Sequence, residues 1–254
     1  MNGSPWRFVG RPRAPVSELM TGELRLTGAL ARYLTRVRRL RAGDAFVAFD
    51  PTTSREADVE VLWAGANTVA VRAGPLREGS RRASRKLTWV QGLAKGNKCD
   101  AIVRDATELG VTRIVVASTH RSVVRLDPNR AAERQARWAR IAGEAARQSG
   151  RSDVPSIDDP CPWNSAIARA TVRGALGFCL WEHAMQPLGP ALLAALDGVT
   201  PLAFACGPEG GLDEQEVAEA SAHGWMIASL GSLALRTETV AAAVLGAVRV
   251  LSET

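Results

Sequence analysis

The feature that most constrains this chain is the alternation of apolar strand patterns with helical patterns after residue 87. The predicted strands span residues 87–93, 113–117, 175–180, 201–206 and 225–230. The predicted helices span residues 98–109, 128–148, 213–223 and 238–251, and a further helix contains residues 192–196. Strands that alternate with helices form a mostly parallel sheet with helices on both faces. Ligands bind to such sheets beyond the carboxyl ends of the strands.

The first 72 residues follow a different pattern, which is typical of a small β-barrel. A single helix is predicted over residues 27–40, and the predicted strands span residues 7–9, 45–49, 57–63 and 67–71. Val59, Val61 and Trp63 alternate with polar residues and are predicted to share one face. Residues 73–86 are polar and basic and are predicted to form a linker. The predicted domains are therefore residues 1–72 and 87–254.

Basic side chains are concentrated in the first third of the chain. The net charge of +6 divides into +4 for residues 1–72, +4 for residues 73–86 and −2 for residues 87–254. A basic module joined to a nearly neutral one is typical of a nucleic-acid-binding appendage on an enzyme. Only three of the 32 basic residues are lysines, however, and a GC-rich genome favours arginine without any function. Charge alone therefore leaves nucleic-acid binding open.

Several other classes of protein are excluded or disfavoured. No stretch approaches the roughly 18 apolar residues of a membrane span, and we expect no secretory signal. The four cysteines have no paired spacing and the three histidines lie far apart, so we expect neither disulfides nor a metal site. Free cysteines are typical of a reducing compartment, so we expect the protein to be cytoplasmic. The fingerprints of Rossmann dinucleotide sites, P-loops and nucleophile elbows are missing. Cys179 and His183 are interpreted as structural residues.

Two loops that follow predicted strands carry most of the polar chemistry. In the first loop, three glycines fall between Gly207 and Gly211 and let the backbone approach a ligand. The helix that follows begins at a capping-box pair, Asp213 and Glu216. This loop also fits a simple tight connection between a strand and a helix. The second loop, residues 230–239, places Arg236 between apolar segments, so its guanidinium must reach solvent, a carboxylate or a ligand.

An ordered set of motifs makes the interpretation more specific. The motifs are KGNKCD at 95–100, ATELGV at 106–111, RSVV at 121–124, EAARQSGR at 144–151, VP at 154–155, GPEGG at 207–211 and LRTET at 235–239. In this order they closely resemble the RsmE family of 16S rRNA uridine-N3 methyltransferases, which belongs to the SPOUT superfamily. The resemblance covers nearly all of residues 87–254 and, more loosely, the first 72.

The resemblance implies a fold, a cofactor and partners. The expected fold is α/β, with an N-terminal PUA-like β-barrel followed by a SPOUT domain with a parallel sheet and a C-terminal trefoil knot. The knot would hold S-adenosylmethionine in a bent shape, and the C-terminal domain would form a homodimer. The substrate would be 16S rRNA, within the small ribosomal subunit. No metal is required, because the cofactor brings its own sulfonium leaving group.

Carried over to this chain, the cofactor pocket would be built from three loops that follow strands. The residues concerned are Leu180, Trp181, Glu182, Gly207, Pro208, Glu209, Gly210, Gly211, Leu230, Gly231, Ser232, Leu235, Arg236, Thr237 and Thr239. Backbone groups of these loops would hold the adenine and the ribose. Three segments depart from the family pattern, namely Tyr33, Trp181-Glu182 and Ser232-Leu233-Ala234. The glycine-rich loop at residues 207–211, called the Gly loop below, and residues 235–239 keep the family pattern, so methyltransferase activity is expected.

The resemblance also suggests the catalytic and RNA-binding residues. Loss of the uridine N3 proton puts negative charge on O2 and O4, which a fixed guanidinium stabilises, so Arg236 is assigned this role. Glu238 is expected to orient Arg236 or to accept the proton, unless it only starts a helix. The target base must be unstacked. The candidate contacts to rRNA phosphates are Arg7, Arg36, Arg39 and Lys95.

Two alternatives stay open at this point. One is a SPOUT methyltransferase that acts on another RNA nucleotide or on a ribose hydroxyl. The other is an RNA-binding ribosome-assembly protein that has lost catalysis.

Overall fold

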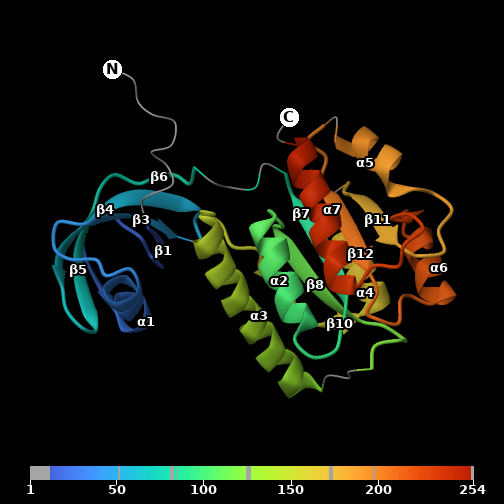
Figure 1. The fold of residues 1–254 in the computed structure, drawn as a ribbon, viewed down its shortest axis with the longest axis horizontal. Helices are drawn as coiled ribbons and strands as arrows, with labels where there is room; N and C mark the ends of the chain where they lie inside the picture. Colours follow the sequence, from blue (N-terminus) through green and yellow to red (C-terminus); the bar gives the residue numbers. More distant parts are fainter. Residues whose placement is uncertain are drawn as a thin grey trace. The chain divides into compact units, whose positions relative to one another are not determined.

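The chain divides into two compact units, which are shown in Figure 1. The computed structural model describes residues 12–50, 52–80, 83, 85–123, 127–171, 174–196 and 198–252. The first unit comprises the described part of Met1–Arg82 together with Ala146–Val154, and the second comprises the described part of Ala83–Ala145 and Pro155–Thr254. The strand predicted at residues 7–9 lies outside the described residues.

The first unit is a mostly antiparallel sheet. Its strands are β1 (Arg13–Pro15), β2 (Gly22–Thr27), β3 (Ala45–Asp50), β4 (Arg55–Ala64), β5 (Thr68–Ala73) and β6 (Arg77–Glu78). They follow the order β1-β3-β4-β5-β2, with β6 paired to β4. Only the β1–β3 pair is parallel. Strand β6 lies within the predicted linker and pairs with β4. The Arg77 guanidinium stabilises this pairing through ion pairs with Glu56 and Asp58 of β4.

The helix predicted over residues 27–40 is shorter in the structure. Helix α1 (Gly28–Arg32) continues as one π-helical turn, Tyr33–Val37, instead of running to residue 40. Arg39 then adopts a φ of 56°, a left-handed conformation that ends helical geometry. Ala31 and Leu34 are buried among the strands, so the helix contributes to the core of the sheet.

One strand prediction in this unit is wrong for a local reason. Val59 and Val61 are buried as expected, but Trp63 is 56% exposed. The register between β4 and β5 shifts between Val61 and Trp63. An extra residue at such a bulge turns the following side chain to the other face. Simple alternation could not show this shift.

A buried polar cluster joins residues 146–154 to the first unit. The Arg13 guanidinium donates to Glu56 Oε2 at 2.6 Å and to Ser152 Oγ at 2.7 Å. Ser152 Oγ in turn donates to Glu56 Oε2 at 2.8 Å, and both side chains are almost fully buried. This cluster explains why the segment belongs to the first unit, although the sequence placed it after the boundary at residue 87.

The second unit contains the predicted parallel sheet. Its strands are β7 (Leu87–Gly92), β8 (Arg113–Ser118), β9 (Ser156–Ile157), β10 (Cys161–Pro162), β11 (Leu176–Leu180), β12 (Leu202–Cys206) and β13 (Met226–Ala228). The order is β10-β8-β7-β12-β11-β13, with β9 on β8, and all the pairs are parallel. The parallel sheet is confirmed, and β9 and β10 are short additions that the sequence did not reveal.

Helices cover this sheet, as expected. They are α2 (Lys98–Glu108), α3 (Pro128–Ser149), α4 (Trp163–Ala170), α5 (Leu188–Leu196), α6 (Glu214–Ala222) and α7 (Thr237–Ser252). Helix α7 packs on α2, α5 and β12, whereas α4 packs on α6, β7 and β8 (Figure 1). None of the helices within the described ranges is long and apolar enough to cross a membrane.

Side-chain alternation along the central strands supplies both layers of the core. Trp89, Phe204 and Phe178 are neighbours in register, and their rings stack across three strands with centroids 6.4 and 5.3 Å apart. Val90 and Ala203 belong instead to the buried cluster that contains residues of α4 and α6. Successive residues point to opposite faces of a strand, so strands rich in apolar residues fill both layers.

Candidate active site

A cavity of about 530 Å³ lies where β11, β12 and β13 lead into their loops. All the predicted cofactor residues except Gly210 and Thr239 line it. The Gly210 carbonyl accepts a hydrogen bond from Arg121 at 2.8 Å, and Thr239 lies in the first turn of α7. Parallel strands end at the same edge of a sheet, which is why three segments far apart in sequence meet here.

The cavity has further walls. Leu233 and Ala234 belong to the predicted loop 230–239, whereas sequence analysis did not assign Lys98, His183, Cys206, Leu212 and Val240 to the pocket. All except Lys98 lie next to a predicted loop or within it. Lys98 opens α2, which belongs to an earlier part of the chain, and only its place in the KGNKCD motif marked that segment.

The glycines of the Gly loop are required by close backbone approaches. A Cβ on Gly207 would lie 2.7 Å from the carbonyl carbon of Gly211. Gly211 has a φ of +72°, and a Cβ there would lie 2.6 Å from Glu182 Oε1. The backbone contact at Gly207 leaves no room for a Cβ, so a larger residue there would force the loop open. At Gly211 the constraint is the positive φ, because the Glu182 carboxylate ends a flexible side chain and can move aside.

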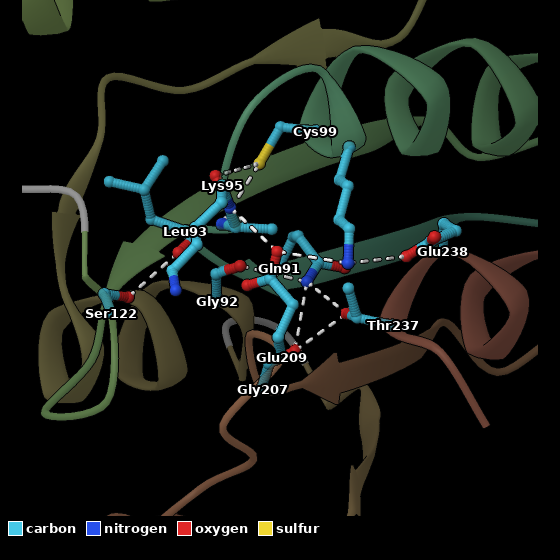
Figure 2. Close-up of polar contacts among 12 residues, drawn as sticks. Gln91, Gly92, Leu93, Lys95, Cys99, Ser122, Gly207, Glu209, Thr237 and Glu238 are labelled. Atoms are coloured by element: carbon cyan, nitrogen blue, oxygen red, sulfur yellow. Dashed lines mark hydrogen bonds and ion pairs between the residues drawn. The ribbon is translucent and has the colours of Figure 1, made fainter. Parts of the chain in front are cut away.

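A buried amide connects the Gly loop to α7, as Figure 2 shows. Gln91 Nε2 lies 2.9 Å from Thr237 Oγ1 and 3.2 Å from the Gly207 carbonyl. Thr237 Oγ1 donates to the same carbonyl at 2.8 Å. Trp89 Nε1 holds the Gln91 side chain by donating to its Oε1 at 2.9 Å. Sequence analysis missed Gln91, whose only signal was a polar residue inside an apolar strand.

An ion-pair cluster borders the cavity. Glu209 Oε1 accepts from the Lys95 backbone N–H at 3.0 Å and lies 3.2 Å from Lys98 Nζ. Lys98 Nζ also lies 3.7 Å from Glu238 Oε2. Figure 2 labels Lys95, Glu209 and Glu238 of this cluster. Burial alone would raise the pKa of Glu209, but the backbone N–H groups and the Lys98 ammonium hold that pKa below its usual value. Glu209 is therefore ionised at neutral pH.

The two predicted catalytic residues lie in different surroundings. Arg236 lines the cavity and is exposed, and its carbonyl accepts from Thr239 and Val240 at the start of α7. No ion pair or hydrogen bond of its guanidinium occurs within the described part of the chain. Glu238 is outside the cavity lining, and its ion-pair partner is Lys98.

Trp181 offers an unused donor in the cavity wall. Its indole Nε1 is buried and has no hydrogen-bond partner among the residues that the structure describes. The Trp181 ring meets the His183 ring edge-on, with centroids 5.2 Å apart. Buried donors without partners are rare in folded proteins. The unused indole N–H, the glycine-lined loop and the free Arg236 guanidinium together fit a polar ligand that enters this cavity.

The predicted RNA-contacting residues are at the surface. Arg36 and Arg39 are exposed in the first unit, and Lys95 is exposed in the second. Arg7 lies outside the described residues. Tyr33, which departs from the family pattern, is covered by the Arg147 guanidinium at 4.0 Å and accepts a hydrogen bond from Arg38 at 2.6 Å. Across the described ranges, no three His, Cys, Asp or Glu side chains are placed to hold a metal ion.

Comparison with known proteins settles the class. Residues 81–249 match the model of an RNA methyltransferase domain, and residues 26–73 match that of an RNA methyltransferase PUA domain. The Mycobacterium tuberculosis ribosomal RNA small subunit methyltransferase E is 33% identical, over 85% of this chain and 82% of the relative. The chain belongs to the ribosomal RNA small subunit methyltransferase E family. The Bacillus subtilis member is 29% identical, over 97% and 96% of the two chains.

Two solved structures with a bound cofactor have the same fold. The Neisseria gonorrhoeae enzyme bound to S-adenosylmethionine is 26% identical with a TM-score of 0.83, over 95% of this chain and 98% of that one. A Legionella pneumophila methyltransferase in complex with the same cofactor is 25% identical with a TM-score of 0.79, over the same shares. The predicted fold class, a PUA-like domain followed by an α/β domain with a parallel sheet, is confirmed.

Proposed function

We propose that this protein transfers a methyl group from S-adenosylmethionine to N3 of a uridine in 16S rRNA of the small ribosomal subunit. The observation that carries the proposal is the cavity, where three loops beyond parallel strands surround the Arg236 guanidinium, which has no partner among the described residues. The cofactor-bound relatives, which match nearly the whole chain, support the choice of cofactor. The knotted arrangement of the C-terminal segment remains part of this proposal.

The chemistry assigns a separate task to each part of the site. The bound cofactor supplies a methyl group on a positively charged sulfonium. The uridine would lose its N3 proton to solvent, and N3 would take the methyl group while the C–S bond of the sulfonium breaks and leaves a neutral thioether. Arg236 stabilises the negative charge that spreads to O2 and O4. Glu238 lies against Lys98 and is assigned to the positioning of that ammonium.

The first unit is proposed to bind the RNA. Arg36 and Arg39 are exposed there and would neutralise phosphates, while Lys95 would do so near the cavity. The target base must leave its stack to reach the cavity. We further propose a homodimer formed through the C-terminal domain, since Val250 and Leu251 of α7 are exposed apolar residues. The site of action would be the cytoplasm, where small subunits are assembled.

A labelling experiment tests the whole proposal. The purified protein is incubated with labelled S-adenosylmethionine and small subunits that lack the modification, and the labelled nucleoside is identified by chromatography and mass. Label in 3-methyluridine is expected. Label in another nucleoside would keep the methyltransferase and overturn the specificity. No label, together with no cofactor binding, would favour an RNA-binding assembly protein that has lost catalysis.

Replacing Gly207 with alanine is expected to weaken cofactor binding at least tenfold, at a cost of about 1.4–3 kcal/mol, because the new Cβ meets backbone atoms. Isothermal titration with S-adenosylhomocysteine measures the loss. Gly143→Ala is the matched control, since a Cβ at this position of α3 meets nothing within 4 Å. The control should bind as the wild type does. Unchanged binding by Gly207→Ala would show that the Gly loop does not contact the cofactor.

A further inference from the structure

We propose that Lys98 and Glu209 bind the amino-acid end of the cofactor, with Lys98 receiving its carboxylate and Glu209 its ammonium group. This inference rests on the proposed function. S-adenosylmethionine carries a nucleoside at one end and a zwitterionic amino acid at the other. A protein that binds both ends needs a cation and a carboxylate close together in the cavity wall. Sequence analysis assigned Glu209 only to the general cofactor loop and did not assign Lys98 at all.

The Lys98 ammonium has the capacity for a further partner. A lysine ammonium carries three N–H donors. Its nitrogen lies 3.2 Å from Glu209 Oε1, and at 3.7 Å from Glu238 Oε2 it forms an ion pair without a hydrogen bond. The side chain is 34% exposed and lines the cavity, so N–H donors remain for a ligand oxygen. Glu238 lies behind Lys98 and holds the ammonium in place from outside the cavity.

Glu209 is fixed as an acceptor. Its contacts to the Lys95 N–H and to Lys98 Nζ fall on Oε1, and the backbone N–H of Glu209 itself also helps to lower its pKa. A carboxylate offers about four lone-pair sites, so a ligand ammonium can still be accepted. Its lowered pKa keeps the carboxylate charged at neutral pH. Because the backbone N–H of Lys95 also holds it, the carboxylate needs little ordering when a ligand arrives.

Other charged residues of the cavity lack this pairing. Arg236 lines the wall without a carboxylate beside it, and Glu182 packs against Gly211. Within the part of the chain that the structure describes, Lys98–Glu209 is the one ion pair whose two members both line the cavity. A zwitterion is complementary to such a pair, because each of its charges meets the opposite one.

The experiment compares two ligands that differ only in the amino-acid end. S-adenosylhomocysteine has the full zwitterion, whereas 5′-methylthioadenosine keeps the nucleoside and the sulfur but lacks the amino acid. Both are titrated calorimetrically into the full-length protein without RNA. The wild type is expected to bind S-adenosylhomocysteine more tightly. Lys98→Met and Glu209→Gln should each lower the affinity for S-adenosylhomocysteine at least tenfold. The affinity for 5′-methylthioadenosine should stay within about twofold of the wild-type value.

Matched variants make the result specific. Lys86→Met removes the same charge at an exposed lysine away from the cavity and should change neither affinity. Lys98→Arg should recover part of the preference for S-adenosylhomocysteine. Since 5′-methylthioadenosine uses the rest of the cavity, its unchanged binding also reports that each variant is folded.

Three results would overturn the inference. Equal weakening of both ligands by Lys98→Met would mean that the lysine only supports the shape of the cavity. Loss of the preference in Arg236→Met, with Lys98→Met unaffected, would assign the amino-acid end to Arg236. A wild type that binds neither ligand would remove the cofactor from the proposed function itself, an outcome distinct from the first two.

Discussion

Replacing Arg236 with methionine is expected to lower kcat for methyl transfer about 100- to 1,000-fold, the usual cost of removing a fixed donor for developing negative charge. The guanidinium has no partner elsewhere in the described chain, so its removal leaves the fold without an uncompensated charge. Single-turnover transfer to unmodified small subunits measures the change. Affinity for 5′-methylthioadenosine should stay the same, because Arg236 is assigned to the uridine.

The dependence on pH distinguishes this role from simple binding. Without the guanidinium, the N3 anion forms less readily, so the variant should gain more activity from rising pH than the wild type does. Arg236→Lys keeps the charge but loses the planar pair of donors. Its gain in activity with rising pH should lie between those of the wild type and Arg236→Met. A variant with normal kcat and a raised KM would instead place Arg236 among residues that only bind RNA.

Replacing Glu56 with glutamine is expected to cost about 3 kcal/mol of folding free energy in the first unit, since it leaves Arg13 buried without its counter-charge. Burial alone would raise the pKa of Glu56, but hydrogen bonds from Arg13 and Ser152 lower it to about 2, from an ordinary value of 4.5. A depressed pKa stabilises the fold above pH 4.5, and this stability is lost as the pH falls from 4.5 toward 2. Urea unfolding of the full-length protein between pH 7 and pH 3 measures both effects.

Glu60 provides the matched control for this prediction. It lies on the same strand, but its side chain is 55% exposed, and its ion pair with Arg72 is long, at 4.0 Å. Glu60→Gln should change the free energy of unfolding by less than about 0.5 kcal/mol. The acid sensitivity should weaken in Glu56→Gln and persist in Glu60→Gln. Equal acid sensitivity in all three proteins would show that Glu56 does not control it.

The sequence predicted the framework of the site because its signals are local. Strands that alternate with helices imply a parallel sheet, and the loops after β11, β12 and β13 then share one edge. The capping box at Asp213 and Glu216 is confirmed, with both reciprocal hydrogen bonds at 2.8 and 3.0 Å. Each of these predictions depends on residues within a few positions of one another.

The features that sequence analysis missed depend on distant contacts. Lys98 reaches the cavity only because α2 lies against α7, which brings it to Glu238. Gln91 is recognisable as a hub only once Gly207 and Thr237 surround its amide. Trp63 was predicted on the buried face of β4, but one inserted residue turns its side chain to the other face. Ser152 was predicted in the second domain, but its partners Arg13 and Glu56 belong to the first unit. None of these contacts leaves a periodic pattern.

The buried Gln91 amide also has a consequence for how a ligand enters and leaves. The Gly loop and the start of α7 depend on the same side chain, so neither can move without breaking hydrogen bonds of the other. The Gly loop and the start of α7 therefore form one connected wall of the cavity. The segment from Leu230 to Arg236 is exposed along its whole length. We therefore expect that substitutions in this segment change the rate of ligand exchange more than substitutions in the opposite wall do.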